Sequence, residues 1–472
     1  MKRSILLYPL LLVIFAFSIW FVIDSGKNLT PESRLSIAAE KSNPAAIISW
    51  ESLTDLYFDF TGGSFGLLLL QIITILLVSK VFGAVITKFG QPAVVGEMVA
   101  GIFLGPSIIG LAFPGFSDFL FPKNSLIYLQ LLSQIGLVFF MFIIGMDLDI
   151  ERLKSKACDA LVISNVSIIF PYFLGVCVSY FIYEQFAPAN AGFTAFALFM
   201  GIAVSITAFP VLARILQERR LTKTSLGAIV ISCAAFDDVT AWCMLATVLA
   251  IVKAGSIAIA LLTIFLSVIF VLIMFYIVRP FMKKVFTSPA DAKNLNKPLV
   301  VIVFFVLLSS AFVSETIGIH ALFGAFLAGV IMPKNVRFKE LLVEKTEDLS
   351  VLLLLPVFFA LTGLRTQIAL LNDWQLWATF GLIIFIALLG KFAGSAFAAK
   401  LTGCSWKDAL SIGALMNTRG LMELIVLNIG YDAGILSPAL FAILVLMALT
   451  TTLMTGPLLD LIEYCDREKK LL

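Results

Sequence analysis

The segment 225–252 reads SLGAIVISCAAFDDVTAWCMLATVLAIV, an apolar run interrupted near its middle by two adjacent aspartates. A run of this length is long enough to cross a bilayer as a helix. A charged carboxylate at the centre of a membrane helix costs about 2.5–3.5 kcal/mol on insertion scales, so acids at this depth usually face a protein interior and serve a function. The segment therefore predicts a membrane helix that carries a functional carboxylate pair, Asp237 and Asp238.

The rest of the chain has the composition of a membrane protein. Of its 472 residues 60% are hydrophobic and 13% are charged, and the mean hydropathy is +1.05. A soluble domain of this size needs far more polar surface, so we expect an all-α polytopic membrane protein. The net charge of +3 gives no indication of a nucleic-acid partner, and the six cysteines form no CxxC pair that would suggest a metal or disulfide framework. The expected spans are 4–23, 65–87, 92–112, 126–146, 160–183, 191–213, 225–252, 256–278, 298–316, 319–332, 349–364, 374–399, 408–430 and 437–461.

The distribution of Lys and Arg predicts the orientation, because cytoplasmic loops of membrane proteins are enriched in both. With the N-terminus in the cytoplasm, 24 of the 33 Lys and Arg residues fall on the cytoplasmic side, six on the outer side and three within spans. We therefore expect a multi-pass protein embedded in the lipid bilayer of the cell (inner) membrane, with a cytoplasmic C-terminus.

The N-terminal segment has two interpretations. Lys2 and Arg3 precede an apolar run, and residues 16–18 (AFS) would fit a signal-peptide cleavage site. Bulky residues continue through Val22, which favours a retained anchor. The expected parts of the chain are an N-terminal anchor or signal segment with an extracytoplasmic loop (1–64), a transmembrane domain (65–461) and a short cytoplasmic tail (462–472).

Two pairs of similar segments indicate an internal duplication. GEMVAGIFLGP (96–106) resembles GAFLAGVIMP (324–333), and VFFMFIIGMDLDI (138–150) resembles VFFALTGLRTQI (357–368). The alternative is that glycine packing motifs recur by chance in membrane helices. Two similarities in matching order make a duplication the better explanation.

The duplication predicts two six-span blocks, 65–252 and 298–461. A single span, 256–278, separates the blocks, so they must cross the membrane in opposite directions. Inverted repeats of this kind are typical of secondary transporters, whose substrate site lies where the repeats meet.

The aspartate pair could bind either a proton or a cation. Removal from water and the neighbouring charge both disfavour ionisation, so Asp237 and Asp238 are easily protonated. A cation that neutralises the pair also stabilises it, and a site shared by proton and cation is the minimum that antiport requires. The alternative is structural: one aspartate caps a broken helix and the other pairs with a basic residue.

Lys391 is the expected basic partner. It lies deep in the span 374–399, too far from either end for its ammonium group to reach the headgroups easily. We expect it to face the interior and to pair with Asp237, and to release a proton if cation binding breaks that pair. The alternative is a lysine that serves only helix packing.

Two spans, the fifth of each block, contain helix-breaking sequence. SITAFPVLAR (205–214) includes Thr207 and Pro210, and proline removes a backbone hydrogen bond and clashes with the preceding turn. MNTRGLMEL (416–424) places polar residues and a glycine at membrane depth. Broken helices expose carbonyls and half-helix dipoles that can act on a cation, and the Thr207 hydroxyl is a suitable ligand. The alternative is a simple proline kink.

Other polar residues within spans are secondary candidates for binding a proton or a cation. Glu423 follows Arg419 by one turn, so the two could merely pair with each other. His320, the only histidine, opens the span 319–332, where a pH-sensing role competes with an ordinary role at a helix end. The secondary candidates are Glu97, Glu315, His320, Asn417, Arg419 and Glu423.

Five motifs together resemble the monovalent cation:proton antiporter-2 family: GQPAVVGEMVAGIFLGPSIIG, SITAFPVLARIL, AFDDVTAW, GIHALFGAFLAGVIMP and MNTRGLMELIVLNIG. The last three of these motifs are most similar to the plant and fungal cation/proton exchanger branch and to bacterial relatives. The resemblance covers about 65–461 and implies a sodium/proton antiporter-like fold, a core domain with two crossed broken helices, and a separate dimerisation domain. It also implies elevator-like alternating access in a homodimer, with protons and Na⁺ or K⁺ as substrates and no cofactor.

The resemblance assigns roles to four residues. Asp238 would be the essential ion and proton carboxylate, Asp237 its partner in holding the transported Na⁺ or K⁺, Thr207 a ligand at the crossing point, and Lys391 the basic partner. The chain departs from the plant branch, which usually has Asn before the aspartate, and from the glutathione-gated potassium systems, which have Gln. The double acid resembles that of bacterial, electrogenic sodium/proton antiporters, whereas the flanking sequence resembles that of potassium-linked exchangers, so the choice between Na⁺ and K⁺ stays open.

Other classes fit less well. Intramembrane aspartyl proteases carry their two aspartates on separate helices, and the chain has no GxxxxGK[ST] loop for ATP, so we expect neither an enzyme nor an ATP-driven pump. The nearer alternative is a cation channel or gated potassium efflux pathway, in which the same carboxylates would select cations in an open pore.

Overall fold

The computed structural model describes most of the chain. The first expected span, 4–23, falls mostly outside the described part, in which residues 18–25 are helical, and the expected loop 26–63 lies outside it entirely. The described residues are 14, 16, 18–25, 64–89, 91, 93–122, 124–147, 157–189, 191–221, 224–254, 257–286, 297–333, 342, 343 and 348–471.

The described part of the chain is helical and contains no strand. Ten of its helices are long and apolar enough to cross a membrane. The protein is therefore an all-helical, multi-pass membrane protein, as the composition predicts.

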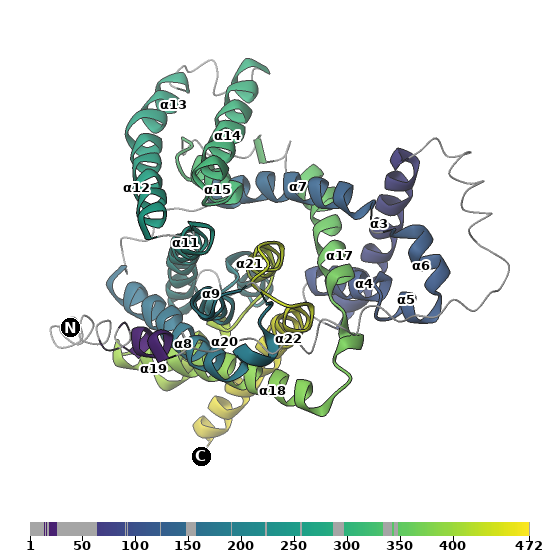
Figure 1. Ribbon diagram of the computed structural model, residues 1–472. Coiled ribbons are helices and arrows are strands. Elements are labelled where there is room, and N and C mark those ends of the chain that lie inside the picture. Colours follow the sequence, from purple (N-terminus) through teal and green to yellow (C-terminus); the bar gives the residue numbers. More distant parts are fainter. Residues whose placement is uncertain are drawn as a thin grey trace.

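The helices pack as two sets, which Figure 1 shows as two groups of ribbons. We call the first the scaffold set: α3 (Ser64–Lys88), α4 (Ala93–Leu104), α7 (Leu126–Asp147), α14 (Lys297–Ile317), α15 (Ala321–Val330) and α17 (Leu355–Arg365). We call the second the core set: α8 (Ala157–Phe186), α9 (Phe193–Ser205), α10 (Phe209–Glu218), α11 (Ser225–Ala254), α18 (Trp374–Leu388), α19 (Gly394–Leu401), α20 (Trp406–Met416), α21 (Leu421–Asp432) and α22 (Pro438–Leu471).

Extensive helix packing falls within each set. In the scaffold set α4 packs on α3 and α17, and α15 packs on α7 and α14; in the core set α8 packs on α9, α11 and α19. The long linking helix α12 (Ile257–Ile273), continued by α13 (Arg279–Val285), touches α11 of one set and α14 of the other. The short helices α5 (Ile109–Ala112) and α6 (Pro114–Leu120) follow α4.

Glycines allow the closest contacts in the scaffold set. A Cβ atom on Gly101 of α4 would lie 2.7 Å from the Cα of Ala360 in α17, and one on Gly363 would overlap the backbone of Gly101. Helices α7 and α15 meet in the same way, since a Cβ on Gly145 would lie 3.0 Å from the Cα of Gly329. Small residues let membrane helices approach until their backbones touch. These glycines belong to the two pairs of similar segments, and each contact joins a segment of one block to a segment of the other.

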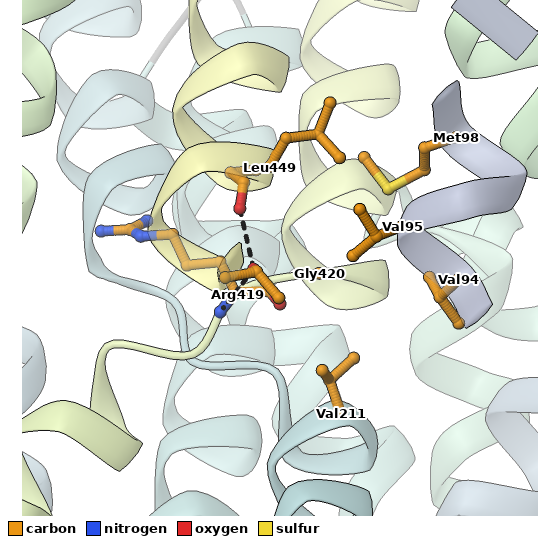
Figure 2. Close-up of a pocket in the computed structure, with 9 residues that line it drawn as sticks. Val94, Val95, Met98, Val211, Arg419, Gly420 and Leu449 are labelled. Carbon is orange, nitrogen blue, oxygen red and sulfur yellow. Dashed lines mark hydrogen bonds between the residues drawn. The ribbon is translucent and has the colours of Figure 1, made fainter. Parts of the chain in front are cut away.

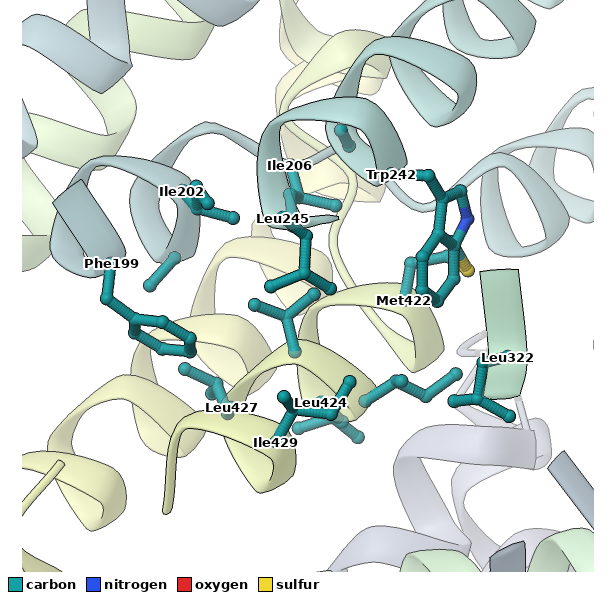
Figure 3. Close-up of a cluster of buried hydrophobic side chains, with 14 of the residues drawn as sticks. Phe199, Ile202, Ile206, Trp242, Leu245, Leu322, Met422, Leu424, Leu427 and Ile429 are labelled. Carbon is teal, nitrogen blue, oxygen red and sulfur yellow. The ribbon is translucent and has the colours of Figure 1, made fainter. Parts of the chain in front are cut away.

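Two broken helices lie side by side in the core set. The chain leaves helical geometry at residues 206–208, between α9 and α10, and again at 417–420, between α20 and α21. The two breaks are joined directly, because the backbone N–H of Ala208 donates a hydrogen bond of 3.0 Å to the carbonyl of Thr418. Buried apolar side chains of α9, α11 and α21, together with Leu322 of α15, pack beside the breaks (Figure 3). They include Phe199 and Ile202 of α9, Trp242 and Leu245 of α11, and Leu424 and Leu427 of α21.

Several predicted span boundaries differ from the structure, and the linking span, predicted to end at 278, continues through α13 to Val285. Helix α4 ends at Leu104 instead of continuing to residue 112, because Gly105 and Pro106 interrupt it and proline cannot continue the hydrogen-bond ladder. Helix α15 has ten residues, about 15 Å, and is shorter than the predicted 319–332, since His320 adopts a φ of +83° outside the helical region. Helix α22 continues to Leu471, beyond the predicted end at 461.

Candidate functional site

The two adjacent aspartates lie at the centre of the core set, on α11. Both side chains are buried, with about 1% of the surface of each residue exposed. Successive residues on a helix point about 100° apart. Asp237 and Asp238 consequently have different surroundings.

Asp237 is surrounded by donors. The hydroxyl of Ser164 on α8 donates to its Oδ1 at 2.5 Å. Its Oδ2 accepts from Lys391 Nζ at 2.9 Å and lies 2.7 Å from the hydroxyl of Thr207 and 3.3 Å from that of Ser167. Both oxygens are therefore satisfied, and the positive charge of Lys391 balances the carboxylate.

Lys391 lies where α18 changes into α19. The residues Leu389–Ala393 form a π-helical turn, a local widening that is rare in helices and frequent at functional sites. Here the helix also approaches α8 closely, because a Cβ on Gly390 would lie 2.6 Å from the Pro171 side chain. The fully buried ammonium group of Lys391 thus reaches Asp237 and the Ser167 hydroxyl, which is 3.0 Å away.

Thr207 connects the carboxylate to both broken helices. It lies in the non-helical segment 206–208, and its hydroxyl is 2.7 Å from Asp237 Oδ2 and 3.1 Å from the carbonyl of Met416, the last residue of α20. The single hydroxyl proton is donated to one of these two acceptors. A change in the charge of Asp237 can therefore change whether Thr207 donates to Asp237 or to the carbonyl of Met416 at the second break.

Asp238 is buried without a partner. Among the described residues, neither of its oxygens has a hydrogen-bond partner, and the same holds for Trp242 Nε1 and the side-chain amide of Asn417. Trp242 follows Asp238 by four residues and so lies on the same face of α11. A buried ionised carboxylate without a partner is strongly destabilised, so Asp238 requires a proton or a cation to neutralise it.

Arg419 and Glu423 form a second buried charge pair beside the breaks. Their side chains are 3.2 Å apart and fully buried. Arg419 also donates to the carbonyls of Ala203, at 3.1 Å, and Val204, at 2.5 Å. These carbonyls lie in the last turn of α9, where backbone acceptors lack helical partners and a positive charge is favourable. Arg419 therefore fastens the second break to the end of α9.

Three of the predicted secondary residues lie away from the aspartates, in or beside the scaffold set. Glu97 is on α4 and half-buried. Glu315 on α14 accepts a hydrogen bond of 2.7 Å from the backbone N–H of Ala321, at the start of α15. His320 precedes that helix as its N-cap. The structure does not bring these residues together with Asp238.

Two contributors were missed from the sequence, Ser164 and Ser167. Both are fully buried on α8 and bind Asp237. Their spacing of three residues within the apolar span 160–183 places them on one helix face, which was the available signal.

A small cavity of about 10 Å³ lies where the second helix break meets the scaffold set (Figure 2). Arg419 and Gly420 border it from the second break, and Val94, Val95 and Met98 of α4 face them. The lining on the scaffold side is aliphatic. It is completed by Val211 of α10 and by Ala448, Leu449 and Thr452 of α22.

Comparisons with known proteins cover the same part of the chain. The model of the transmembrane sodium/hydrogen exchanger family matches residues 73–462. The Na(+)/H(+) antiporter NhaS4 of Synechocystis sp. is 41% identical over 393 residues, which are 83% of this chain and 96% of that protein. Cation/H(+) antiporter 17 of Arabidopsis thaliana is 42% identical over 393 residues, and the chain spans about half the length of that protein, 48%.

The fold is similar to that of a solved structure, the sodium proton antiporter MjNhaP1 from Methanocaldococcus jannaschii. The TM-score is 0.59, and the likeness covers 86% of this chain and 96% of that one. The sequences are only 14% identical, so this likeness concerns the fold alone.

Proposed function

The chain belongs to the sodium/hydrogen exchanger family of transmembrane proteins, and on this premise we propose that it exchanges Na⁺ or K⁺ for protons. The exchange is secondary active transport with alternating access. In it, a proton and the cation compete for one buried carboxylate, that of Asp238.

The unpartnered state of Asp238 is the observation that carries the proposal. Asp237, its neighbour, has a complete set of donors and a balancing lysine, whereas Asp238 has buried oxygens with no protein partner among the described residues. Desolvation makes the charge on Asp238 unfavourable until a proton or a cation arrives. Two ligands that satisfy the same need at the same place exclude each other, and that exclusion couples their transport.

Asp237, Thr207 and Lys391 prepare the site. The ion pair between Asp237 and Lys391 places a net neutral group beside Asp238, so that an entering cation meets one unbalanced carboxylate. If the cation draws Asp237 away from Lys391, the lysine loses its counter-charge and releases a proton. Thr207 then offers its hydroxyl oxygen as a ligand to the cation.

The arrangement of helices supports an alternating-access architecture. We propose that the two six-span blocks are inverted repeats. The glycine contacts of the scaffold set support this, because they join the second span of each block to the third span of the other. The core set would move against the scaffold set, and the scaffold set would form the contact of a homodimer. Charge distribution supports an inner-membrane location with a cytoplasmic C-terminus. The exchanger domain is then 65–461, preceded by the N-terminal segment 1–64 and followed by the tail 462–472.

Substitution of Asp238 tests the proposal. In everted vesicles with an imposed proton gradient, Asp238→Asn should abolish Na⁺- and K⁺-dependent proton release, because an amide cannot bind a proton and a cation alternately. The exchange rate should fall by more than about a hundredfold, because removing a group that a mechanism cannot replace lowers the rate at least this much.

Asp373→Asn is the matched control. Asp373 is an exposed carboxylate in the connection before α18, and its substitution should leave exchange unchanged. Both variants must remain in the membrane as folded protein, which size-exclusion chromatography of the purified chain measures. Exchange retained by a folded Asp238→Asn variant contradicts the assignment.

The second candidate function is a cation channel or gated potassium efflux pathway. The carboxylate site would serve it equally well, so the distinction is kinetic. An antiporter shows obligatory counterflow, whereby an inward cation gradient drives protons outward without a shunt conductance; a channel does not. A cation flux that is independent of the proton gradient in reconstituted vesicles would favour the channel.

A further inference from the structure

A cluster of polar side chains joins the two helix sets at one side of the molecule. Arg365, the last residue of α17, pairs with Asp432, the last residue of α21, at 3.0 Å. The Arg365 guanidinium also donates to Asn428 Oδ1 at 2.9 Å and lies over the ring of Tyr431, 5.6 Å from its centroid. Gln130 of α7 donates to the second oxygen of Asp432 at 3.1 Å.

These contacts connect the two helix sets, which the proposed function requires to move against each other. Arg365 and Gln130 belong to the scaffold set, whereas Asn428 and Asp432 belong to the core set. The amide of Asn428 adds a fourth connection, donating to the hydroxyl of Thr362 on α17 at 2.8 Å. A displacement of one set against the other must break all of them.

The position of Asp432 makes the pair necessary. A carboxylate at the C-terminal end of a helix is disfavoured by the helix dipole, and a cation is favoured there. The positive charge of Arg365 neutralises the Asp432 carboxylate and also supplies the cation that this helix end favours. The two side chains are only partly exposed, 15% for Arg365 and 36% for Asp432, so solvent replaces the contact incompletely while the two sets stay together.

A cavity of about 30 Å³ lies directly behind this cluster, between the two sets. Ser133 and Gln134 of α7 and His320 line it together with the cluster residues. Apolar side chains, among them Leu137, Leu322 and Phe358, make up most of the remaining lining. This boundary between the sets thus carries the ion pair and hydrogen bonds of the cluster, whereas the boundary beside Gly420 is mainly aliphatic and has one hydrogen bond of 3.4 Å, from the Gln91 amide to the carbonyl of Leu453.

At the opposite ends of the helices, two charge pairs between described residues lie within the core set. Arg219, just after α10, pairs with Asp460 of α22, and Lys407 of α20 pairs with Asp466 of α22. All four residues belong to, or directly follow, helices of the core set. These pairs can persist while the core set moves as one body.

We propose that Arg365, Asp432, Gln130 and Asn428 form a latch that closes the route between Asp238 and the side of the membrane that the Lys and Arg distribution places outside. Opening the latch exposes the cavity that Ser133, Gln134 and His320 help to line, and gives a cation its entry to the site from the outer solution. The proposal rests on the exchange function and assigns it a gate.

Cross-linking tests the latch directly. Cysteines replace Arg365 and Asp432 in a background in which the exposed Cys243 and Cys465 are changed to serine, and a short bifunctional thiol reagent joins the new pair. Cross-linking should stop exchange in reconstituted vesicles, and reduction should restore it, because the core set can no longer move away from the scaffold set.

The same chemistry within the core set is the matched control. Cysteines at Arg219 and Asp460, cross-linked identically, should leave exchange unchanged, because both positions move together. Unimpaired exchange by the cross-linked 365/432 protein overturns the latch. A background protein that exchanges nothing before any cross-link refutes the exchange function instead, so the two failures are distinguishable.

Accessibility of the cavity provides a measurement that does not depend on transport. A cysteine introduced at Ser133 should react with a membrane-impermeant thiol reagent from the outer side faster in Asp432→Asn than in the parent. The expected increase is about 1.5- to 5-fold, the shift in the open population that follows from losing one partly exposed ion pair. Arg365→Gln should give the same increase, and Asp460→Asn should give none. Equal reaction rates in all four proteins contradict the latch.

Discussion

At the scale of single residues, the adjacent Asp237 and Asp238 have different surroundings. Asp237 is engaged by two serines, a threonine and a lysine, whereas the adjacent Asp238 has no partner among the described residues. The helix separates the two by about 100°, which is enough to direct one toward donors and the other away from them. The two carboxylates therefore differ in their surroundings, and the proposed function assigns the competing proton and cation to the second.

Removing Lys391 should cost stability. Lys391→Ala leaves Asp237 as a buried carboxylate without its counter-charge, and breaking such a pair typically costs about 3–5 kcal/mol. Thermal unfolding of the purified protein at neutral pH measures the loss. The double variant Asp237→Asn, Lys391→Ala should recover part of it, because no uncompensated charge remains.

Lys407→Ala is the control for this prediction. It removes one partner of an ion pair with Asp466, but the Lys407 side chain is 42% exposed, so the loss should stay within about 1 kcal/mol. Equal losses for the Lys391 and Lys407 variants would mean that the buried pair does not hold the core set together.

Sequence reasoning reached the charged residues of the site but not the uncharged ones. A lysine or an aspartate at membrane depth is rare and needs a reason, so Asp237, Asp238 and Lys391 were identifiable. Serine is common in membrane helices, where its hydroxyl can bond to its own backbone. The spacing of Ser164 and Ser167 places them on one helix face, but their role as partners of Asp237 emerged only when the structure placed α8 against α11.

At the scale of elements, hydropathy predicted where most helices lie but not how they pack. Apolar length is a property of one segment, so spans such as 126–146 and 225–252 correspond to α7 and α11 within a few residues. Which helix packs on which depends on surface shape in three dimensions. The crosswise contacts of α4 with α17 and of α7 with α15 therefore emerged only from the structure.

A side chain at Gly363 should separate two helices. Gly363→Val places methyl groups into the backbone of Gly101, and overpacking of this kind costs about 1–3 kcal/mol. The thermal midpoint of the purified protein should fall accordingly. Gly381→Ala on α18 is the control, since no atom lies within 4 Å of the added Cβ and alanine favours the helix. A midpoint unchanged by Gly363→Val would show that α4 and α17 tolerate separation.

At the scale of the whole molecule, the charged chemistry is concentrated in one helix set and the second set carries little of it. The broken helices, the aspartates, Lys391 and the Arg419–Glu423 pair are all in the core set. This division suits a mechanism in which the binding site travels intact, since no ligand has to be left behind. The boundary between the sets then decides to which side the site is open.

Competition at one carboxylate predicts how transport depends on pH. A proton on Asp238 excludes the cation, so acidification on the side of cation entry should raise the apparent KM for Na⁺ or K⁺, by at most about tenfold per pH unit for one competing proton. The maximal rate at saturating cation should change much less. Initial rates measured across a matrix of pH and cation concentration check this, and an apparent KM that is independent of pH would exclude a shared site.

The aliphatic lining beside Gly420 has a mechanical consequence. Val94, Val95 and Met98 of α4 face Val211 of α10 and Leu449 of α22 with no directional bond between them (Figure 2). Dispersion forces vary little as one smooth hydrocarbon face slides over another, so this seam should offer little resistance to movement of the core set along the scaffold set. Exchanging valine for isoleucine there should barely alter the turnover rate, whereas an additional buried amide that donates to a backbone carbonyl across the seam, as Gln91 donates to Leu453 at 3.4 Å beside it, should slow turnover.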